Sequence, residues 1–307
     1  MDTLLQQLIN GIVQGSIYAL VALGYTMVYG IMGLINFAHG EVVMIGAMVA
    51  ISALGALMAL GLPMGLAAPL ALAAAMLVCM GLGAGLERIA YRPLRNAPRL
   101  TPLITAIGMS IILQNLAMMI WSRNYLTFPS LIEKVSFEVA GAHFSNVQAL
   151  IVVLAGLSMA GLLLLVYRTR LGMAMRATSQ NLAVARLMGV DVDRVIAAAF
   201  IIGSAMGALA GFMVGAYYEI AHYQMGFMLG LKAFTAAVLG GIGNLAGAML
   251  GGLLLGIIEA LGAGYIGDLT GGFLGSHYQD IFAFVVLIGV LMFRPSGLLG
   301  EKTGERA

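Results

Sequence analysis

Charged residues are scarce in this chain of 307 residues, where Asp, Glu, Lys and Arg together make up 9% and hydrophobic residues 61%. Soluble globular domains carry about 25% charged residues. The apolar residues form continuous runs of about 20, the length of helix that crosses the hydrocarbon core of a bilayer. A β-barrel would need alternating apolar and polar positions instead. The sequence therefore predicts an all-α fold, a polytopic transmembrane helical bundle.

Motifs that mark common enzymes are also missing. There is no G-x-x-x-x-G-K-[ST], no H-E-x-x-H and no G-x-S-x-G, which argues against P-loop ATP hydrolysis and two kinds of hydrolase site. The single cysteine, Cys79, allows no internal disulfide. The stretch MDTLLQQLING has no basic residue before the first apolar run, unlike a secretory signal, so we expect mature protein from residue 1. We predict no catalytic residues, no metal, no cofactor and no nucleic-acid partner.

Eight apolar regions are candidate membrane elements. Seven have the length of one helix, and the eighth, residues 229–263, is broken by glycines. Together they predict about eight to nine spans in one domain, residues 1–307. The regions are 9–30, 41–61, 64–86, 102–121, 147–167, 195–218, 229–263 and 279–293.

Basic residues are concentrated in three of the polar segments between these regions. Residues 87–100, residues 168–194 and the tail from Arg294 contain 12 of the 15 Lys and Arg residues. Cytoplasmic loops of membrane proteins concentrate Lys and Arg. We therefore predict that these segments are cytoplasmic, that the N-terminus is outside and that the C-terminus is inside.

This orientation constrains region 229–263, which lies between two outer loops and must enter the membrane and return. It is too short for two full crossings. Two short helices meeting at its central glycines would form a re-entrant or discontinuous pair, which must be buried in protein or face a wet cavity; a glycine-tolerant packing kink is the alternative. The central glycines are Gly240, Gly241 and Gly243.

Glycines spaced by four also occur in this region. Gly243, Gly247 and Gly251 would leave one helix face almost without side chains. A neighbouring helix can approach such a face closely. We predict a helix-packing role for these three residues and assign them no chemistry.

The stretch LINFAHGEVVMIG, residues 34–46, places polar and ionisable side chains in an apolar part of the chain. An ionised glutamate in the membrane costs at least a few kcal/mol. Glycines on both sides indicate a break in the helix, as at the discontinuous helices of transport sites. We predict that four residues line the translocation pathway or its gate, the alternative being an interfacial loop with hydrated charges. They are Asn36, Phe37, His39 and Glu41.

Other polar residues lie within the predicted spans. A stripe on the first span is predicted to face protein or water, either through interhelical hydrogen bonds or as a pathway wall. Glu259 and Lys232 are predicted to snorkel or to pair locally near the outer boundary, without a transport role. The stripe consists of Asn10, Gln14, Tyr18, Tyr25 and Tyr29.

Four stretches together resemble the permease subunits of bacterial branched-chain amino acid ABC transporters, the high-affinity hydrophobic amino acid uptake family. The resemblance covers nearly the whole chain, and NFAHGE is its most recognisable part. The length suits the shorter of the two permease subunits. The stretches are GSIYALVALGYTMVYGIMGLINFAHGEVVMIGAMVA, RLGMAMRATSQNLAVARLMGVDVDRV, AAVLGGIGNLAGAMLGG and RPSGLLG.

The resemblance implies a multi-pass subunit of the bacterial inner membrane, embedded in the lipid bilayer, that imports leucine, isoleucine or valine. Its partners would be a second related permease subunit, two ATP-binding subunits and a periplasmic substrate-binding protein. A urea or short-chain amide ABC permease is the alternative within the class. Outside the class of ABC permeases, the alternative is a self-sufficient channel or an ion-coupled carrier. An intramembrane enzyme is the least favoured of these functions.

The resemblance also points to the cytoplasmic segment 168–194 as the coupling loop. We predict a short helix within 176–190, capped by Ser179 or Asn181 and closed by Gly189 in the left-handed conformation. Arg176, Ala185 and Gly189 are predicted to couple the chain to an ATP-binding subunit; a helix lying on anionic lipid headgroups is the alternative. The glutamate of the general ABC permease loop motif is absent, because Ala183 stands in its place.

Overall fold

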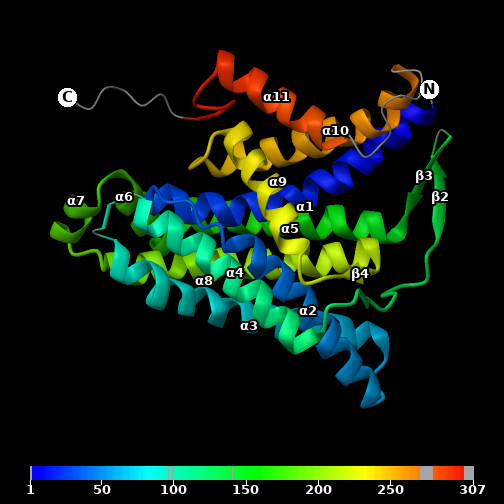
Figure 1. The fold of residues 1–307 in the computed structure, drawn as a ribbon, viewed down its shortest axis with the longest axis horizontal. Helices are drawn as coiled ribbons and strands as arrows, with labels where there is room; N and C mark the ends of the chain where they lie inside the picture. Colours follow the sequence, from blue (N-terminus) through cyan, green and yellow to red (C-terminus); the bar gives the residue numbers. More distant parts are fainter. Residues whose placement is uncertain (1, 96, 99, 140, 270–278, 301–307) are drawn as a thin grey trace.

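The computed structural model describes residues 2–95, 97–98, 100–139, 141–269 and 279–300 as an elongated bundle of helices (Figure 1). Most helices run roughly along the long axis of the bundle. They are α1 Asp2–Met32, α2 His39–Ala59, α3 Met64–Leu86, α4 Leu100–Trp121, α5 Asn146–Arg168, α6 Arg170–Gln180, α7 Leu182–Leu187, α8 Val192–Tyr218, α9 Met225–Gly240, α10 Leu245–Leu269 and α11 Gln279–Phe293.

Two pairs of short antiparallel strands lie in the loops, which the sequence analysis did not predict. The strands β2 Ser136–Val139 and β3 Ala142–Ser145 form a hairpin, and β1 Leu126–Thr127 pairs with β4 Ile220–Ala221. The hairpin lies beside the start of α1, at the end of the bundle that we call the hairpin end (Figure 1). The helices α6 and α7 lie at the opposite end, the α7 end.

Seven helical segments among the described residues are long and apolar enough to cross a membrane, which supports a multi-pass membrane protein. The helices α9 and α11 are apolar but shorter. The number of crossings and their orientation stay predictions. The seven segments are Thr3–Met32, His39–Ala59, Met64–Leu94, Leu100–Trp121, Asn146–Arg168, Val192–Tyr218 and Leu245–Ile266.

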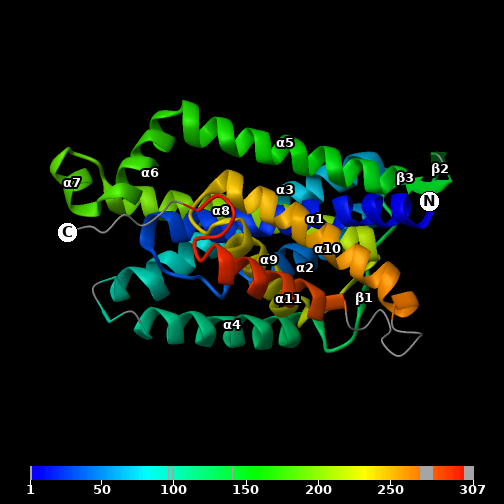
Figure 2. The same cartoon turned by 90° about the horizontal axis from the view of Figure 1, so that it is seen from above.

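The helix α1 forms the centre of the bundle, and α4 and α5 lie on opposite sides of it (Figure 2). Its most extensive neighbour is α10. Glycines let the two backbones touch: a Cβ atom at Gly15 would lie 2.8 Å from the Leu253 Cα atom, and one at Gly11 2.6 Å from the Ile257 Cα atom. Such close approach favours helix association in membranes, where packing replaces the hydrophobic driving force.

The glycine-broken region is divided as predicted, because α9 ends at Gly240 and α10 begins at Leu245. Gly241 and Gly243 have φ angles of 108° and 97°, which residues with side chains rarely adopt. The prediction of two short helices was wrong for the second one: α9 has 16 residues, but α10 has 25. The second helix is longer because it continues into the segment predicted to be an outer loop.

Two of the three spaced glycines, Gly247 and Gly251, pack against a neighbouring helix as predicted, and Gly243 does not. Gly247 lies where α10 meets α9, and a Cβ atom there would lie 2.5 Å from the Gly240 carbonyl oxygen. Gly251 contacts the backbone of α9 at Ala236 in the same way. Gly243 lies in the turn before α10, so its positive φ, and not helix packing, explains the absence of a side chain.

Candidate functional site

The chain reverses direction between α1 and α2 at the polar stretch singled out by the sequence. Gly33 has a φ angle of 64°, and α2 begins at His39, whose backbone N–H donates to the Asn36 carbonyl oxygen at 3.0 Å. The predicted break in the helix is therefore present. His39 is only 2% exposed and Glu41 is fully buried. The alternative of hydrated charges in an interfacial loop does not fit these two side chains.

The His39 ring fills a slot between α1 and α8. Gly24 on α1 has no room for a Cβ atom because the ring occupies that space, and a Cβ atom at Gly207 on α8 would lie 3.3 Å from the ring. The Tyr25 ring contacts it edge-on, with 5.0 Å between centroids. Gly24 lies about 12 Å from the C-terminal end of α1, at a rise of about 1.5 Å per residue. Because the ring of His39, the first residue of α2, contacts Gly24, α2 starts inside the bundle.

Glu41 connects the start of α2 to α4 and α9. Its Oε1 atom accepts hydrogen bonds from Ser110 Oγ at 3.0 Å and from Gln114 Nε2 at 2.8 Å. Its Oε2 atom points at the first turn of α9, where a Cβ atom at Gly226 would lie 2.6 Å away. Within the described part of the chain this second oxygen has no hydrogen-bond partner. A carboxylate held by neutral donors is therefore buried at a junction of three helices.

The other two predicted residues lie beside this junction. The Tyr91 hydroxyl donates to Asn36 Oδ1 at 2.7 Å, which connects the reversal to the helical turn Glu87–Tyr91 that follows α3. The Phe37 ring packs against Phe234 of α9, with 5.7 Å between centroids. The structure thus brings Asn36, Phe37, His39 and Glu41 into one layer, although each contacts a different neighbour.

Two helices begin in this layer. Gly40 in the first turn of α2 packs against the first turns of α9: a Cβ atom at Gly40 would lie 2.9 Å from the Gly230 Cα atom, and one at Gly226 would lie 2.5 Å from the Gly40 carbonyl oxygen. Discontinuous helices whose N-termini meet within a bundle form the substrate sites of many transporters. We call this meeting of α2 and α9 the helix junction.

A second polar cluster lies on the opposite face of α9 and was missed. Glu259 of α10 is fully buried, and its Oε2 atom accepts from Tyr18 at 2.7 Å and from Gln14 at 3.0 Å and pairs with Lys232 Nζ at 3.2 Å. The prediction that Glu259 and Lys232 snorkel or pair locally is confirmed as local pairing. The signal was available, because an ionisable residue inside a membrane span is by default a functional candidate.

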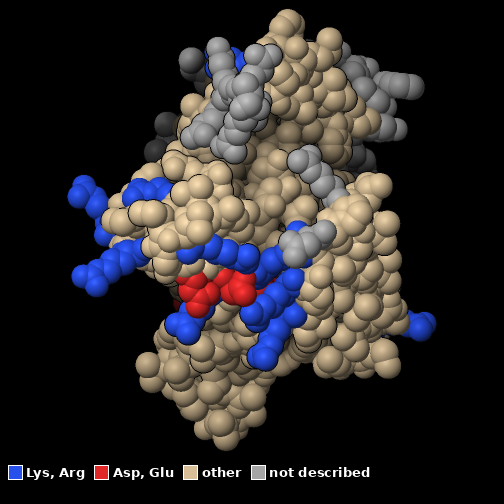
Figure 3. All heavy atoms as spheres, turned by 90° about the vertical axis from the view of Figure 1, so that its left-hand side faces the viewer, with Lys and Arg blue, Asp and Glu red and all other residues tan. Residues whose placement is uncertain are grey.

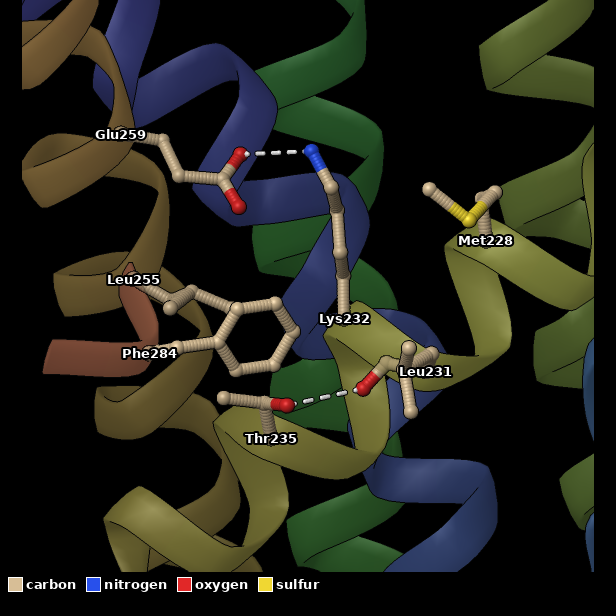
Figure 4. A pocket seen from close by; sticks show the side chains of 7 residues that line it. All are labelled: Met228, Leu231, Lys232, Thr235, Leu255, Glu259 and Phe284. Atoms are coloured by element: carbon tan, nitrogen blue, oxygen red, sulfur yellow. Dashed lines mark hydrogen bonds and ion pairs between the residues drawn. The ribbon is translucent and has the colours of Figure 1, made fainter. Parts of the chain in front are cut away.

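Two cavities adjoin Lys232. The larger, of about 280 Å³, lies between α1, the end of α8, the β4 segment and the first turns of α9. The smaller, of about 30 Å³, lies between α9, α10 and α11, and matches the volume of about one water molecule. Figure 4 shows the smaller cavity, with the Lys232 ammonium group directed at the Glu259 carboxylate and Phe284 below them.

The segment 168–194 contains two helices where one was predicted. The helix α6 ends at Gln180, and Asn181 caps α7 by accepting from the backbone N–H groups of Ala183 and Val184. Ser179 is not a cap, because it lies within α6 and its hydroxyl donates to the Arg176 carbonyl oxygen at 2.8 Å. Gly189 has a φ angle of 83°, as predicted for a left-handed end.

The side chains of α7 divide into an inner and an outer set. Ala185 is buried against the rest of the chain, whereas Leu187 and Met188 are 86% and 80% exposed. Arg176 of α6 lies over the Tyr167 ring at 5.3 Å. An exposed apolar tip on a short helix at one end of the bundle is a surface that another molecule can cover.

Basic residues surround acidic ones at this α7 end (Figure 3). Asp193 at the start of α8 pairs with Arg92 at 2.9 Å, with Arg186 at 3.5 Å and also with Arg95. Arg95 in turn pairs with the buried Glu87 at the end of α3. This ionic network joins the α3–α4 connection to α7 and α8.

Comparisons with known proteins place the chain in a family. Residues 7–291 match the family model of the branched-chain amino acid transport system permease component. The high-affinity branched-chain amino acid transport system permease protein BraD of Pseudomonas aeruginosa is 47% identical, over 98% of this chain and 97% of the relative. LivH of Escherichia coli, whose printed name describes the same type of permease, is 45% identical over the same shares.

A more distant relative is the autoinducer 2 import system permease protein LsrC of Yersinia enterocolitica, 35% identical over 42% of this chain and 36% of that protein. No solved structure matches the chain significantly. The relatives that the chain matches over its full length are transport subunits and not enzymes. The chain therefore belongs to the family of permease components of branched-chain amino acid transport systems.

Proposed function

We propose that this chain is the membrane-spanning permease subunit of an ATP-driven ABC importer that carries leucine, isoleucine and valine into the cell. The observation that carries the proposal is the similarity, over nearly the whole chain, to two high-affinity branched-chain amino acid permeases. The whole chain, residues 1–307, acts as one permease domain in the bacterial inner membrane. It forms the translocation pathway with a second, related permease.

The helix junction is the proposed gate of this pathway. Asn36, Phe37, His39 and Glu41 lie in one layer inside the bundle, at the start of a discontinuous helix. Glu41 Oε2 is buried without a hydrogen-bond partner among the described residues. Buried polar groups are normally satisfied, so this oxygen is consistent with a group that gains a partner in another state of the transporter.

The α7 end is the proposed docking surface for an ATP-binding subunit, and two such subunits complete the importer. The exposed Leu187 and Met188 form the apolar contact, Ala185 fixes α7 on the permease, and Gly189 allows the sharp turn into α8. Arg176 lies at the base of the same segment. The ionic network around Asp193 connects this surface to α8 and to the α3–α4 connection.

In the proposed orientation of the molecule in the membrane, the α7 end lies in the cytoplasm and the hairpin end lies outside. Lys and Arg concentrate in cytoplasmic loops, and they gather at the α7 end (Figure 3). A periplasmic substrate-binding protein then delivers substrate at the hairpin end, where the larger cavity lies.

Reconstitution tests the function. The chain is placed in proteoliposomes with its candidate second permease and ATP-binding subunits, and leucine uptake is measured with and without ATP and binding protein. Uptake that requires both is the expected result. Transport by the chain alone, without ATP-binding subunits, would instead indicate a channel or an ion-coupled carrier. Uptake of urea or a short-chain amide in place of leucine would overturn the substrate class.

A further inference from the structure

The larger cavity lies on the route between the hairpin end and the helix junction. Tyr125 and His222 stand at its loop side, and Met225, the first residue of α9, lines it from below. The next residue, Gly226, contacts Gly40 of the helix junction. A molecule that enters from the hairpin end therefore meets this cavity before it reaches the gate.

The cavity has the size and lining that a small amphipathic solute requires. Its volume of about 280 Å³ corresponds to roughly nine water molecules at about 30 Å³ each. One side is apolar, with Val214, Met228 and Leu229. Methionine side chains adapt to apolar groups of different shape, so this side suits aliphatic side chains that branch at different positions.

The charged group of the lining comes from α9, the helix that also supplies Met228 and Leu229. Lys232 is the one lysine or arginine among the described residues that line the cavity. Its side chain keeps 15% of its surface exposed, whereas its partner Glu259 has none exposed. The ammonium group also lies 3.4 Å from the Tyr18 hydroxyl and 5.7 Å from the centroid of the Tyr18 ring.

Glu259 acts as a positioning residue for this lysine. Its Oε2 atom receives three donors from three side chains, Gln14, Tyr18 and Lys232, in a fully buried setting. The carboxylate therefore holds the Lys232 ammonium group in a fixed position at the border of the cavity.

We propose that this cavity is an intermediate binding site for the transported α-amino acid, in which the Lys232 ammonium group binds the substrate carboxylate. The inference rests on the proposed import function and adds where the substrate is held. The substrate's aliphatic side chain packs on Met228 and Leu229. Its ammonium group faces the rings of Tyr125 and Tyr218, since aromatic faces attract cations.

Protection of an engineered thiol tests the site directly. Leu229→Cys is placed in a Cys79→Ala background in the assembled transporter, and its modification by a membrane-impermeant thiosulfonate is timed. Leucine at about twice its dissociation constant should slow the reaction about threefold. The carboxylate analogue 4-methylpentanoate should also protect, whereas isoamylamine, which lacks the carboxylate, should not.

The role of the lysine is tested in the same assay. Lys232→Met leaves Glu259 buried without this cation, which can prevent folding, so the double variant Lys232→Met with Glu259→Gln is measured beside it. Both variants should lose protection by leucine, and Lys232→Arg should keep part of it. Protection of equal size in the double variant, or protection by isoamylamine, would overturn the proposal.

Leucine uptake by the unmutated chain separates this inference from the proposed function. If ATP-dependent leucine uptake is present but leucine does not protect the thiol introduced at position 229, the import function stands and the binding site is rejected. If no leucine uptake occurs, the import function is rejected, and the binding site is rejected with it.

Discussion

Two buried carboxylates, Glu41 and Glu259, are stabilised in different ways. Glu259 pairs with a lysine 3.2 Å away. Glu41 receives neutral donors, Ser110 and Gln114, and lies in the first turn of α2, where the helix dipole favours a negative charge. All of its described donors belong to α4. The hydrogen bonds of Glu41 are therefore sensitive to movement of α4, whereas those of Glu259 depend on α1 and α9.

Removing the charge of Glu41 should reduce transport without preventing assembly. Glu41→Gln has nearly the same shape, and its carbonyl oxygen can still accept from Gln114, so we expect ATP-dependent leucine uptake to fall about tenfold, about 1.4 kcal/mol in activation free energy. The matched control is Glu138→Gln, at an exposed glutamate in the hairpin. Wild-type uptake by Glu41→Gln, at equal yield of the complex, would contradict a role in the gate.

At the level of elements, the helix junction depends on two backbones in contact. Gly40 of α2 has backbone atoms of α9 on the side where a side chain would stand. Gly55 lies on the same helix, but no atom lies within 4 Å of the place where its Cβ atom would be. The two glycines therefore form a matched pair that separates packing from helix propensity.

Alanine at these two positions should have opposite effects on stability. Gly40→Ala forces α2 and α9 apart and should cost about 1–3 kcal/mol, as overpacking of a close contact does. Gly55→Ala removes a flexible residue from an open helix position and should stabilise the chain by about 0.5–1 kcal/mol. Thermal unfolding of the purified chain in detergent measures both changes. Equal shifts of the midpoint in the same direction would show that the contact is not tight.

The tip of α7 provides the second test at this scale. Leu187 and Met188 are exposed while Ala185 is buried, so acidic substitutions at the tip leave the permease intact and place charge in the proposed contact. Leu187→Glu with Met188→Glu should lower co-purification of the ATP-binding subunits by at least about tenfold, the effect of losing a hot spot of about 1.4 kcal/mol or more.

Ser179→Glu, an exposed position on α6, adds the same kind of charge nearby and is the control. Recovery of the ATP-binding subunits at wild-type yield by the double variant would reject the docking surface. The helix α7 would then be a helix that lies on lipid headgroups.

For the whole molecule, the sequence predicted most of the single helices but not their neighbours. The predicted spans 102–121 and 147–167 match α4 and α5 almost to the residue, because apolar length and loop polarity are local properties. The cluster of Gln14, Lys232 and Glu259 was missed, since these residues come from three helices. Periodicity identifies a buried face but does not say which helix it meets. The start of α1 at Asp2 was missed because polar Gln6 continues the helix and bonds the hairpin.

The orientation of the molecule in the membrane is the prediction with the widest consequences, because it decides which end meets substrate and which end meets ATP-binding subunits. The single substitutions Ser136→Cys, exposed on the hairpin, and Ser179→Cys, exposed on α6, report on the two ends in a Cys79→Ala background. An impermeant thiol reagent applied to intact cells should label the hairpin variant but not the α6 variant, and both should react after the membrane is opened. The physical reason is the gathering of Lys and Arg at the α7 end, since such residues stay in the cytoplasm during insertion. Labelling of the α6 variant in intact cells would show that the molecule has the opposite orientation. The larger cavity would then lie on the cytoplasmic side of the gate.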